Sequence, residues 1–443
     1  MAHSSSSSEQ RTNMTEKTKE APDVSGDDND FERVEDPAPS PLPPPPSEES
    51  LAAWVQVMAA FVISFNTWGL SNTFGVFQTY YQMNLLRSET SSDIAWIGST
   101  QAFFLFLVSL GAGPAFDRGY LRQLLWVGST LFILGMFLVG IATQYYQVFL
   151  TQALLMGIGF GCIYVPAPVV VSQYFQKRAA LAIGVTSAGT ALGGILYPIV
   201  FTQLQPRIGF AWTTRVIAFI LVGTSVIPLL FMKSRAPPKP SRNLLDPTVF
   251  RDIPYILYST GLVLGFMGFF IIFNYIQLFA IDRTSTTKSV TDNILVIINS
   301  SSLIGRVAGG LYSDKIGCIH VLAQATVITS ILTYSLIAIH TTAGLVVYAV
   351  LVGITSGAFT GLPATGIVAL SPDKSKVGTR LGMTLAYIGV GVLVGNPIAG
   401  AILGQTGNWV GLLVFCASIL AASFALIVAS RIAKVGVGLK HKI

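Results

Sequence analysis

The fold is decided by two stretches that lie about half a chain apart, Gly113-Pro-Ala-Phe-Asp117-Arg118-Gly119 and Gly310-Leu-Tyr-Ser-Asp314-Lys315-Ile-Gly317. In both, a glycine lies four residues before an acid, a basic residue follows the acid, and the stretch ends a long apolar run. Such a corner lets two membrane helices approach closely and then turn in the headgroup region, where the charges can pair. Its repetition 197 positions later predicts a duplicated membrane protein, and parallel repeats occur in transporters.

Composition also places the chain in a lipid bilayer. Of its 443 residues, 52% are hydrophobic and only 11% are charged, too few charges to coat a water-soluble globule. Residues 1–50 differ, because they hold 12 of the 21 acids and a proline-rich stretch with little to bury. They are predicted to form a disordered cytosolic N-terminal tail. The rest is basic, which we attribute to short loops that set membrane orientation, so no nucleic-acid partner is expected.

Twelve apolar runs follow the tail, and each has the length of about 20 residues that a helix needs to cross a bilayer. A basic, proline-containing segment separates the first six from the last six. We therefore predict an all-α membrane protein with 12 transmembrane helices in two pseudo-symmetric six-helix bundles, 51–232 and 253–432. A cytosolic linker, 233–252, joins them, and a short cytosolic C-terminal tail, 433–443, follows. The predicted spans are 51–80, 93–116, 121–143, 148–175, 179–204, 211–232, 253–280, 291–312, 319–340, 343–370, 380–403 and 409–432.

Basic residues are distributed unevenly between the two ends of these spans. About 17 Lys and Arg lie on the side of the linker, whereas five lie on the other side: Arg87, Arg207, Arg215, Arg283 and Lys288. Because basic loops stay in the cytosol, this asymmetry predicts a multi-pass protein with both termini cytosolic. The plasma membrane is the favoured location, with the vacuolar or another internal membrane as the alternative.

Glycines repeat the pattern inside the spans. Gly157 and Gly161 in the fourth span recur as Gly353 and Gly357 in the tenth, 196 positions later. Glycines in membrane helices are usually packing points where backbones come close. We therefore expect the two halves to be built on equivalent helix contacts. Prolines in corresponding spans predict kinks; they are Pro166, Pro168, Pro198, Pro363 and Pro397.

This 6+6 layout, with Gly-x-x-x-Asp-Arg/Lys after the second and eighth spans, resembles the major facilitator superfamily. The first span, with Asn66-Thr-Trp-Gly-Leu-Ser-Asn-Thr-Phe-Gly-Val-Phe-Gln-Thr-Tyr80, looks like the fungal branch of the monocarboxylate porter family. The resemblance implies a rocker-switch carrier whose central cavity is lined by spans 1, 4, 5, 7, 8, 10 and 11.

The sequence departs from the animal lactate and pyruvate carriers of that family. Those carriers have a lysine in the first span and an aspartate one helical turn before an arginine in the eighth. Arg306 matches the arginine, but Ser302 stands four residues before it, and no lysine lies near Ser71 and Asn72. The comparison therefore argues against proton-coupled transport of a simple carboxylate.

The acids of residues 51–443 all map to loops or helix ends. No carboxylate is thus expected at mid-membrane, where proton-driven carriers commonly use one. Asp93 and Asp292, at the outer mouths of spans two and eight, are the nearest candidates to carry a coupling proton.

Arg306 is a permanent charge inside a predicted span. It lies eight residues before Asp314, about 12 Å along a helix. In one interpretation its guanidinium faces the cavity and binds an anionic part of the substrate. In the other it bonds helix-end carbonyls or the corner acids and holds the cytosolic gate. The sequence leaves both open.

The candidate substrate-binding residues are polar side chains within the spans. Buried amides and tyrosines can equally serve as interhelical hydrogen bonds, so only some are expected to contact substrate. The candidate gating residues are the charged pairs of the two repeated corners. The substrate-binding set is Asn66, Asn72, Tyr164, Asn274, Tyr275, Gln277, Asn299, Arg306 and Tyr387, and the gating set is Asp117, Arg118, Asp314 and Lys315.

These features favour a secondary transporter that exports a fungal secondary metabolite by alternating access. The alternatives are an uptake carrier for a monocarboxylate or another small nutrient, and a non-transporting sensor with a carrier fold. The sequence has no Gly-x4-Gly-Lys-Ser/Thr loop for ATP and no hydrolase or metalloprotease motif. We expect no enzyme activity, no cofactor and no metal. The expected partners are a small-molecule substrate and membrane lipids, with a coupling proton as a further candidate, and the chain is expected to be monomeric.

Overall fold

The computed structural model describes residues 50–175, 178–235, 244–371, 376–404 and 407–436. Every regular element within these ranges is a helix. The predicted N-terminal tail, apart from Ser50, and residues 437–443 of the predicted C-terminal tail lie outside the described residues. Ser50 begins the ordered bundle as a helix N-cap, because its side chain accepts a hydrogen bond from the backbone of Ala53.

Residues 50–235 make up the first half of the bundle. Its first and fourth membrane-crossing segments are each divided into short pieces, three of which are π-helical: η1, η2 and η3. Its elements are α1 (Leu51–Ser64), η1 (Phe65–Gly69), α2 (Leu70–Asn72), α3 (Phe74–Tyr80), η2 (Tyr81–Leu85), α4 (Ser91–Asp117), α5 (Leu121–Val139), α6 (Tyr145–Val148), η3 (Phe149–Met156), α7 (Gly157–Tyr164), α8 (Pro166–Tyr174) and α9 (Ala179–Phe231).

Residues 244–436 make up the second half. A short 3₁₀ turn, η4, precedes its first long helix, and a one-turn helix, α11, that the sequence did not predict comes before the second. Its elements are η4 (Pro247–Arg251), α10 (Ile253–Arg283), α11 (Lys288–Asp292), α12 (Ile294–Ile316), α13 (Cys318–Ser335), η5 (Leu336–Ala338), α14 (Thr342–Gly361), α15 (Pro363–Leu370), α16 (Val377–Leu403) and α17 (Trp409–Val435).

The described residues contain eleven helical segments that are long and apolar enough to cross a membrane, rather than the twelve predicted. The difference lies in α9, which joins the predicted spans 179–204 and 211–232. Gly209 divides α9 with a non-helical backbone, at φ 77° and ψ 169°. Glycine adopts such a positive φ without a steric penalty, so a single residue makes the corner where we expected a loop.

The two halves are built on equivalent helix contacts. In the first half α4 packs on α7, and in the second α12 packs on α14. A Cβ added at Gly157 would lie 2.8 Å from the carbonyl oxygen of Gln101, and one added at Gly353 would lie 2.5 Å from that of Ile298. Both glycines thus allow a backbone contact that a larger residue would block, at positions 196 apart. The predicted duplication is therefore visible in the packing itself.

Breaks at proline also correspond between the halves. The fourth span changes from α7 to α8 at Pro166, and the tenth changes from α14 to α15 at Pro363. Each proline stands at the first helical position, where its missing N–H leaves no hydrogen bond unmade. The predicted breaks in spans four and ten are thus confirmed. Pro198 and Pro397 lie within α9 and α16, which continue through them.

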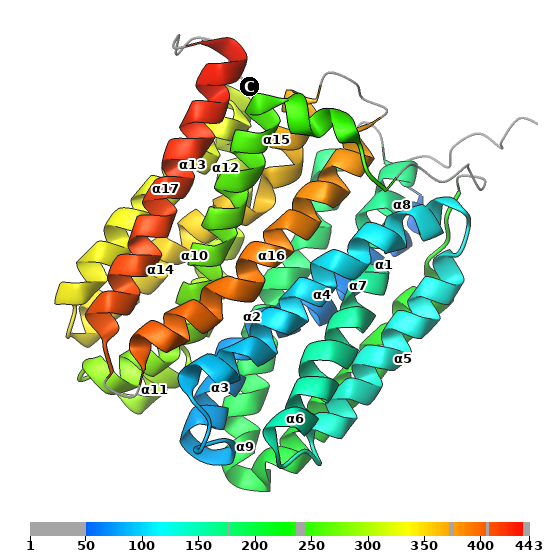
Figure 1. Ribbon diagram of the computed structural model, residues 1–443. Helices are drawn as coiled ribbons and strands as arrows, with labels where there is room; N and C mark the ends of the chain where they lie inside the picture. Colours follow the sequence, from blue (N-terminus) through cyan, green and yellow to red (C-terminus); the bar gives the residue numbers. More distant parts are fainter. Residues whose placement is uncertain (1–49, 176–177, 236–243, 372–375, 405–406, 437–443) are drawn as a thin grey trace, which may run out of the picture. The chain divides into compact units, whose positions relative to one another are not determined.

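The halves meet along two pairs of long helices. Helix α16 packs along α4, and α12 packs on α9 (Figure 1). A third contact brings α3, at the end of the first span, against α10. The candidate substrate-binding residues, Tyr387 excepted, lie near these contacts or near η1 and α7.

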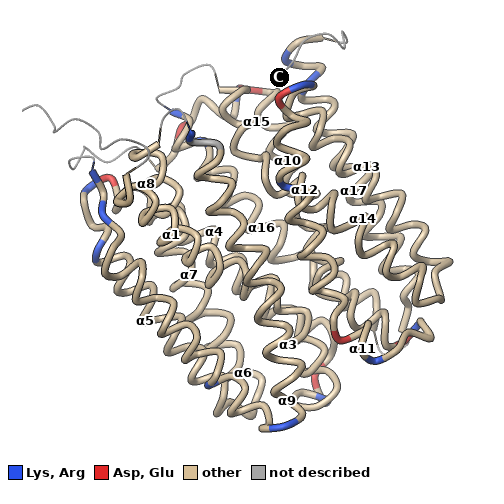
Figure 2. The backbone as a smooth tube through the Cα atoms, turned by 180° about the vertical axis from the view of Figure 1, so that it is seen from behind, with Lys and Arg blue, Asp and Glu red and all other residues tan. Residues whose placement is uncertain are grey.

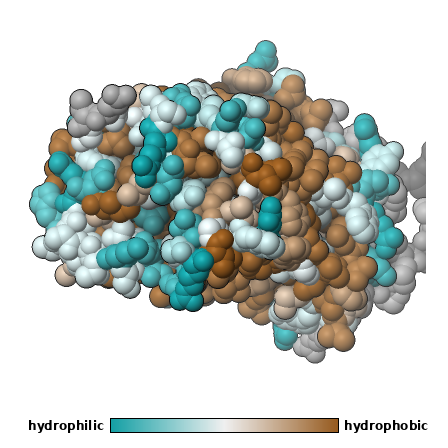
Figure 3. Space-filling model, turned by 90° about the horizontal axis from the view of Figure 1, so that it is seen from below, coloured by the Kyte–Doolittle hydropathy of each residue, from teal (hydrophilic) through white to brown (hydrophobic). Residues whose placement is uncertain are grey.

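Charged residues lie mostly at the two ends of the bundle, and the segments between are almost free of them (Figure 2). We call the end that carries η4 and the start of α16 the linker side, and the end that carries α11 the opposite side. Large apolar side chains are exposed on the flanks, among them Phe219 and Ile331, which are 58% and 63% exposed. Seen from the opposite side, polar residues gather on the end face, whereas the flank is apolar (Figure 3). This is the surface of an integral, multi-pass membrane protein.

Candidate functional site

An amide pair joins three helices of both halves near the middle of the bundle. Asn299 of α12 is buried, and its Nδ2 donates to the carbonyl oxygens of Gly194 in α9, at 3.1 Å, and of Leu295, at 2.9 Å. Its Oδ1 accepts from Asn72 Nδ2 of α2 at 3.4 Å. A Cβ at position 194 would lie 2.5 Å from Asn299 Oδ1, so the glycine makes room for the amide. Two predicted residues, Asn72 and Asn299, are therefore brought together.

Arg306 lies two helical turns nearer the linker side on α12, about 10 Å from Asn299 along the helix. Its Nη1 donates to the carbonyl oxygen of Ser187 in α9 at 3.0 Å, and its Nε is buried and has no hydrogen-bond partner among the described residues. Tyr164 of α7 lies near enough to interact electrostatically with the guanidinium.

No carboxylate within the described ranges forms an ion pair with Arg306. The structural interpretation expected a bond to a helix-end carbonyl or to a corner acid. Ser187 instead lies inside α9, and Arg306 bonds neither Asp117 nor Asp314 within the described part of the chain. A buried cation is normally paired, so this guanidinium has capacity to bind an anion.

Aromatic rings surround the same level of the bundle. The ring centroid of Trp68, in η1, lies 5.4 Å from that of Phe106 in α4, 5.6 Å from that of Tyr164, and 6.2 Å from that of Phe270 in α10. All three contacts are edge-on, the arrangement that aromatic quadrupoles favour. The indole Nε1 of Trp68 is buried without a hydrogen-bond partner. This aromatic cluster therefore combines apolar surface with a buried donor close to Tyr164.

Further buried polar atoms without a partner lie towards the opposite side. Most buried polar groups in proteins are hydrogen-bonded, so such atoms indicate a place for water or a ligand. They come from the first span, α4, α10 and α16, which belong to both halves. Within the described residues the atoms are Ser71 Oγ, both amide atoms of Gln78, Gln82 Nε2, Gln101 Nε2, Gln277 Oε1 and Asn396 Oδ1.

A pocket of about 440 Å³ opens on the opposite side between the two halves. We call it the vestibule. Tyr80, Gln205, Gln277, Lys288 and Asp292 supply its main polar groups. Burial raises the pKa of the Asp292 carboxyl above its usual range, although the charge of Lys288 opposes the shift. The other predicted proton carrier, Asp93, is engaged in a capping box at the start of α4.

Three predicted residues lie at helix contacts, and two of them, Asn66 and Tyr275, have hydrogen-bond partners. Asn66 lies within the first half, where its Oδ1 accepts from Tyr197 Oη at 2.9 Å and from Thr224 Oγ1 at 3.0 Å. Tyr275 donates to the carbonyl oxygen of Asn396 at 3.1 Å and so joins α10 to α16. Asn274 is buried where α10 meets the first span at Gly75. These residues hold helices together and are not grouped with Arg306.

Tyr387 lies apart from the other candidates. It is 44% exposed and shares one face of α16 with Val390, Val394 and Ile398, which are also exposed. Residues three and four apart lie on the same helix face, so this stripe faces outward along the helix. We therefore leave Tyr387 out of the candidate site.

The predicted gating residues lie at the linker side, at the ends of α4 and α12. Asp314 and Lys315 are exposed, Asp117 is partly buried, and Arg118 is exposed. The close helix contact expected at the corner glycine is absent at Gly310, whose Cβ position has no neighbour within 4 Å. The preceding residue, Gly309, makes that contact instead, against Ala358.

Gln101, Asn396 and Trp68 are candidate site residues that were not predicted from the sequence. Gln101 and Asn396 are each the single amide in their predicted spans, 93–116 and 380–403. A lone amide in a membrane span was the sequence feature that could have identified both residues as site candidates. Ser99 Oγ accepts from Asn396 Nδ2 at 3.1 Å, which adds a polar bond between α4 and α16. Among the described residues, no group of three His, Cys, Asp or Glu side chains could hold a metal ion.

Two halves that repeat one packing scheme and meet around a polar, cationic centre define a membrane transporter. The chain matches the family model described as Major Facilitator Superfamily over residues 50–323 and 284–438. It belongs to the major facilitator superfamily.

Relatives in fungi and a solved structure agree with this assignment. The MFS-type transporter dbaD of Emericella nidulans is 43% identical over 82% of this chain and 83% of its own length. The aspyridones efflux protein apdF of the same fungus is 35% identical over 88% of this chain and 80% of its own length. A POT family transporter crystallised with a thioalcohol-conjugated peptide superposes with a TM-score of 0.70 and 13% sequence identity. The match covers 86% of this chain and 96% of the POT transporter chain, and it shows a shared fold.

Proposed function

We propose that this chain exports an anionic metabolite with an aromatic or extended apolar part. The observation that carries the proposal is Arg306, a guanidinium inside the bundle with no carboxylate partner within the described ranges. The Trp68 cluster beside it supplies aromatic surface for the rest of the molecule. Its relative apdF is named as an efflux protein for aspyridones, which supports efflux of a fungal secondary metabolite over uptake of a nutrient.

The geometry supports a release path through the vestibule. On the linker side the halves are in contact: Arg306 bonds Ser187, and a Cβ at Gly382 of α16 would lie 3.0 Å from Leu110 of α4. On the opposite side the vestibule opens between the halves, beside the contacts of α4 with α16 and of α3 with α10. Substrate enters from the linker side when those contacts part, binds Arg306, and leaves through the vestibule after the halves rock.

The linker side faces the cytosol in this proposal, since most basic residues lie there. Both termini are then cytosolic, the plasma membrane is the site of export, and a monomer suffices because both halves belong to one chain. Asp292 is the carboxylate that binds a coupling proton, because it lines the release path and its pKa is raised by burial.

An unbiased transport experiment tests the proposal. Purified protein is reconstituted into vesicles, selected for the linker side facing outward, and incubated with a fungal metabolite extract; mass spectrometry identifies what accumulates inside. We expect acidic aromatic compounds to accumulate with wild type, and Arg306→Gln to abolish their accumulation. Accumulation of neutral compounds alone, or of the same acids by Arg306→Gln, would show that the assignment is wrong. The matched control is Arg207→Gln, an exposed arginine on the opposite side.

A further inference from the structure

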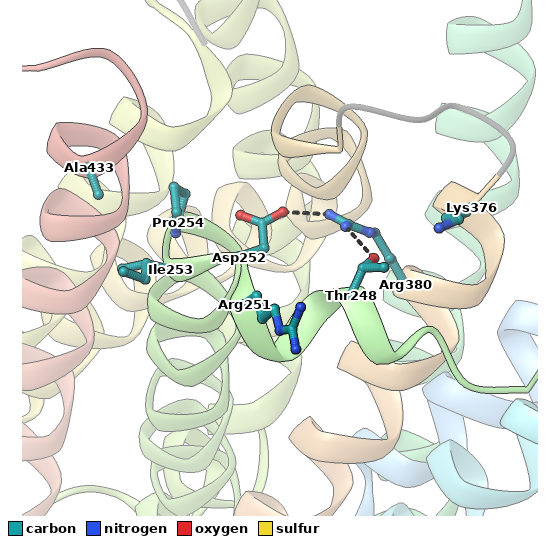
Figure 4. A pocket seen from close by; sticks show the side chains of 8 residues that line it. All are labelled: Thr248, Arg251, Asp252, Ile253, Pro254, Lys376, Arg380 and Ala433. Carbon is teal, nitrogen blue, oxygen red and sulfur yellow. Dashed lines mark hydrogen bonds and ion pairs between the residues drawn. The ribbon is translucent and has the colours of Figure 1, made fainter.

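A second, larger pocket of about 610 Å³ lies on the linker side, away from the transport path. Four elements of the second half form it: η4, α10, α16 and α17. The lining side chains, drawn in Figure 4, are Thr248, Arg251, Asp252, Ile253, Pro254, Lys376, Arg380 and Ala433.

The floor of this pocket is a fixed ion-pair network. Arg380 donates from Nε to Asp246 at 3.2 Å and from Nη1 to Asp252 at 2.7 Å, and Figure 4 shows it between Asp252 and Lys376. Asp246 also accepts from the backbone N and the hydroxyl of Thr248, at 3.1 and 2.7 Å. Burial opposes ionisation of Asp246, but the bonds from Thr248 and Arg380 and the charge of Lys376 lower its pKa below the usual range. The network thus holds η4 against α16.

Basic donors remain available above this floor. Arg380 uses both carboxylates, whereas Lys376 is 43% exposed and reaches Asp246 only at 3.5 Å. Arg251 is exposed and forms no ion pair within the described ranges. Three cations and two acids therefore meet here, and two of the cations can turn towards a ligand. A phosphate group accepts such bonds in a bidentate way.

The rim of the pocket is apolar and exposed. Leu245 is 62% exposed, Phe250 74% and Ile253 62%, although all three lie on or beside η4 next to charged residues. Pro254 and Ala433 continue this apolar wall. Exposed apolar side chains beside basic ones are typical of segments that lie at the boundary of headgroups and acyl chains. The pocket therefore opens at the depth where lipid phosphates lie.

We propose that this pocket binds the phosphate headgroup of an anionic phospholipid in the linker-side leaflet. Arg251 and Lys376 donate to the phosphate oxygens, and Ile253, Pro254 and Ala433 contact the glycerol and upper acyl chain. Bound lipid then joins the segment between the two halves to α16, one of the helices that must move against α4 during transport.

The test uses the full-length protein in neutral detergent, with binding of phosphatidic acid, phosphatidylinositol and phosphatidylcholine followed by native mass spectrometry. Each basic contact to an anionic lipid is expected to change affinity by about 5-fold. We expect the wild-type protein to bind the two anionic lipids more tightly than phosphatidylcholine. The Arg251→Gln variant should bind them about 5-fold more weakly than wild type, and the double variant Arg251→Gln, Lys376→Gln about 30-fold more weakly. Arg251→Lys should retain most of the binding.

Arg122→Gln, an exposed arginine on the same side, is the matched control and should bind as wild type. Equal binding of phosphatidylcholine, or an Arg251→Gln variant with wild-type affinity, overturns the proposal. In a separate competition experiment, millimolar inorganic phosphate is added to the protein with bound lipid. Complete displacement of the lipid by phosphate would show that the pocket is a site for free phosphate instead. None of these readouts requires transport, so they fail or succeed independently of the export assignment.

Discussion

Replacing Arg306 by lysine keeps the charge in the candidate site but removes the fork of donors. The guanidinium bonds Ser187 O through Nη1 while Nε stays free, so it can hold α9 and a ligand at once. A single ammonium cannot keep both in the same geometry. The loss of one charge-assisted hydrogen bond, about 1.5–3 kcal/mol, should weaken substrate binding by about 10- to 150-fold.

Ligand-dependent thermal stability measures this change without transport. The ligand is an acid that accumulates in the vesicle experiment, held at 100 times the wild-type Kd, where it should stabilise wild type by about 2.7 kcal/mol. A 10-fold weaker Kd reduces that stabilisation to about 1.4 kcal/mol, and a 100-fold weaker one to about 0.4 kcal/mol. Arg207→Lys, outside the site, is the control and should match wild type.

The same experiment separates the two interpretations of Arg306. If the residue serves only to join α12 to α9, Arg306→Lys lowers the unfolding temperature of the ligand-free protein but leaves the ligand-induced shift unchanged. That outcome, or a shift equal to wild type with no loss of stability, would refute the ligand role.

Three further predictions follow from the packing and the charges. Gly357→Ala should lower the free energy of unfolding by about 1–3 kcal/mol, because the added methyl group would overlap a backbone carbonyl of α12. Gly310→Ala, where the added methyl group meets open space, should be neutral or slightly stabilising in the same thermal unfolding assay. Equal losses of stability in the two variants would contradict the packing argument. Burial raises the pKa of Asp292, so acidifying the opposite side should protonate it at a higher pH than an ordinary aspartate. Because we propose that this proton is coupled to export, the acidification should speed efflux, and Asp292→Asn should flatten the pH profile of efflux; an unchanged profile would exclude this role. Arg380→Met should cost about 3–5 kcal/mol at neutral pH, because the partly buried Asp252 loses its ion-pair partner and the buried Asp246 keeps only Thr248 and the more distant Lys376 among the described residues. Because the folded-state pKa of Asp246 is lowered, the deficit should be complete above the ordinary aspartate pKa and shrink as pH falls through the folded value. Unfolding midpoints measured across pH would show this, and a deficit independent of pH would contradict it.

The architecture could be predicted because its signals are local and repeated. Apolar runs mark the spans, and the glycines at 157 and 353 mark equivalent contacts without any knowledge of their partners. The corner at Gly209 could not be predicted, because a single residue with positive φ makes the turn and no polar loop marks it in the sequence.

The site was harder to predict because its residues depend on distant neighbours. Asn66 and Asn299 look equivalent in sequence, yet Asn66 is satisfied by Tyr197 and Thr224, more than 100 positions away, whereas Asn299 joins the two halves. Tyr387 was misplaced because a tyrosine in an apolar run does not reveal which way its helix is rotated. Asp93 could have been recognised, since a threonine three residues before an acid at a helix start is a capping pattern.

The hydrogen bonds between the halves affect how fast the carrier changes conformation and how strictly that change depends on bound substrate. Arg306 to Ser187, Asn299 to Gly194, and Asn396 to Ser99 all cross from one half to the other, whereas the close contacts of Gly157 and Gly353 lie within a half. Each half should then travel as a rigid block, and every turnover must break the crossing bonds, at about 1 kcal/mol apiece, before the blocks can tilt. Without substrate, the carrier would then stay in one conformation. A substrate that accepts hydrogen bonds from the same donors would replace the crossing bonds and allow the conformational change, so few transitions, and little leakage of other solutes, would occur without substrate.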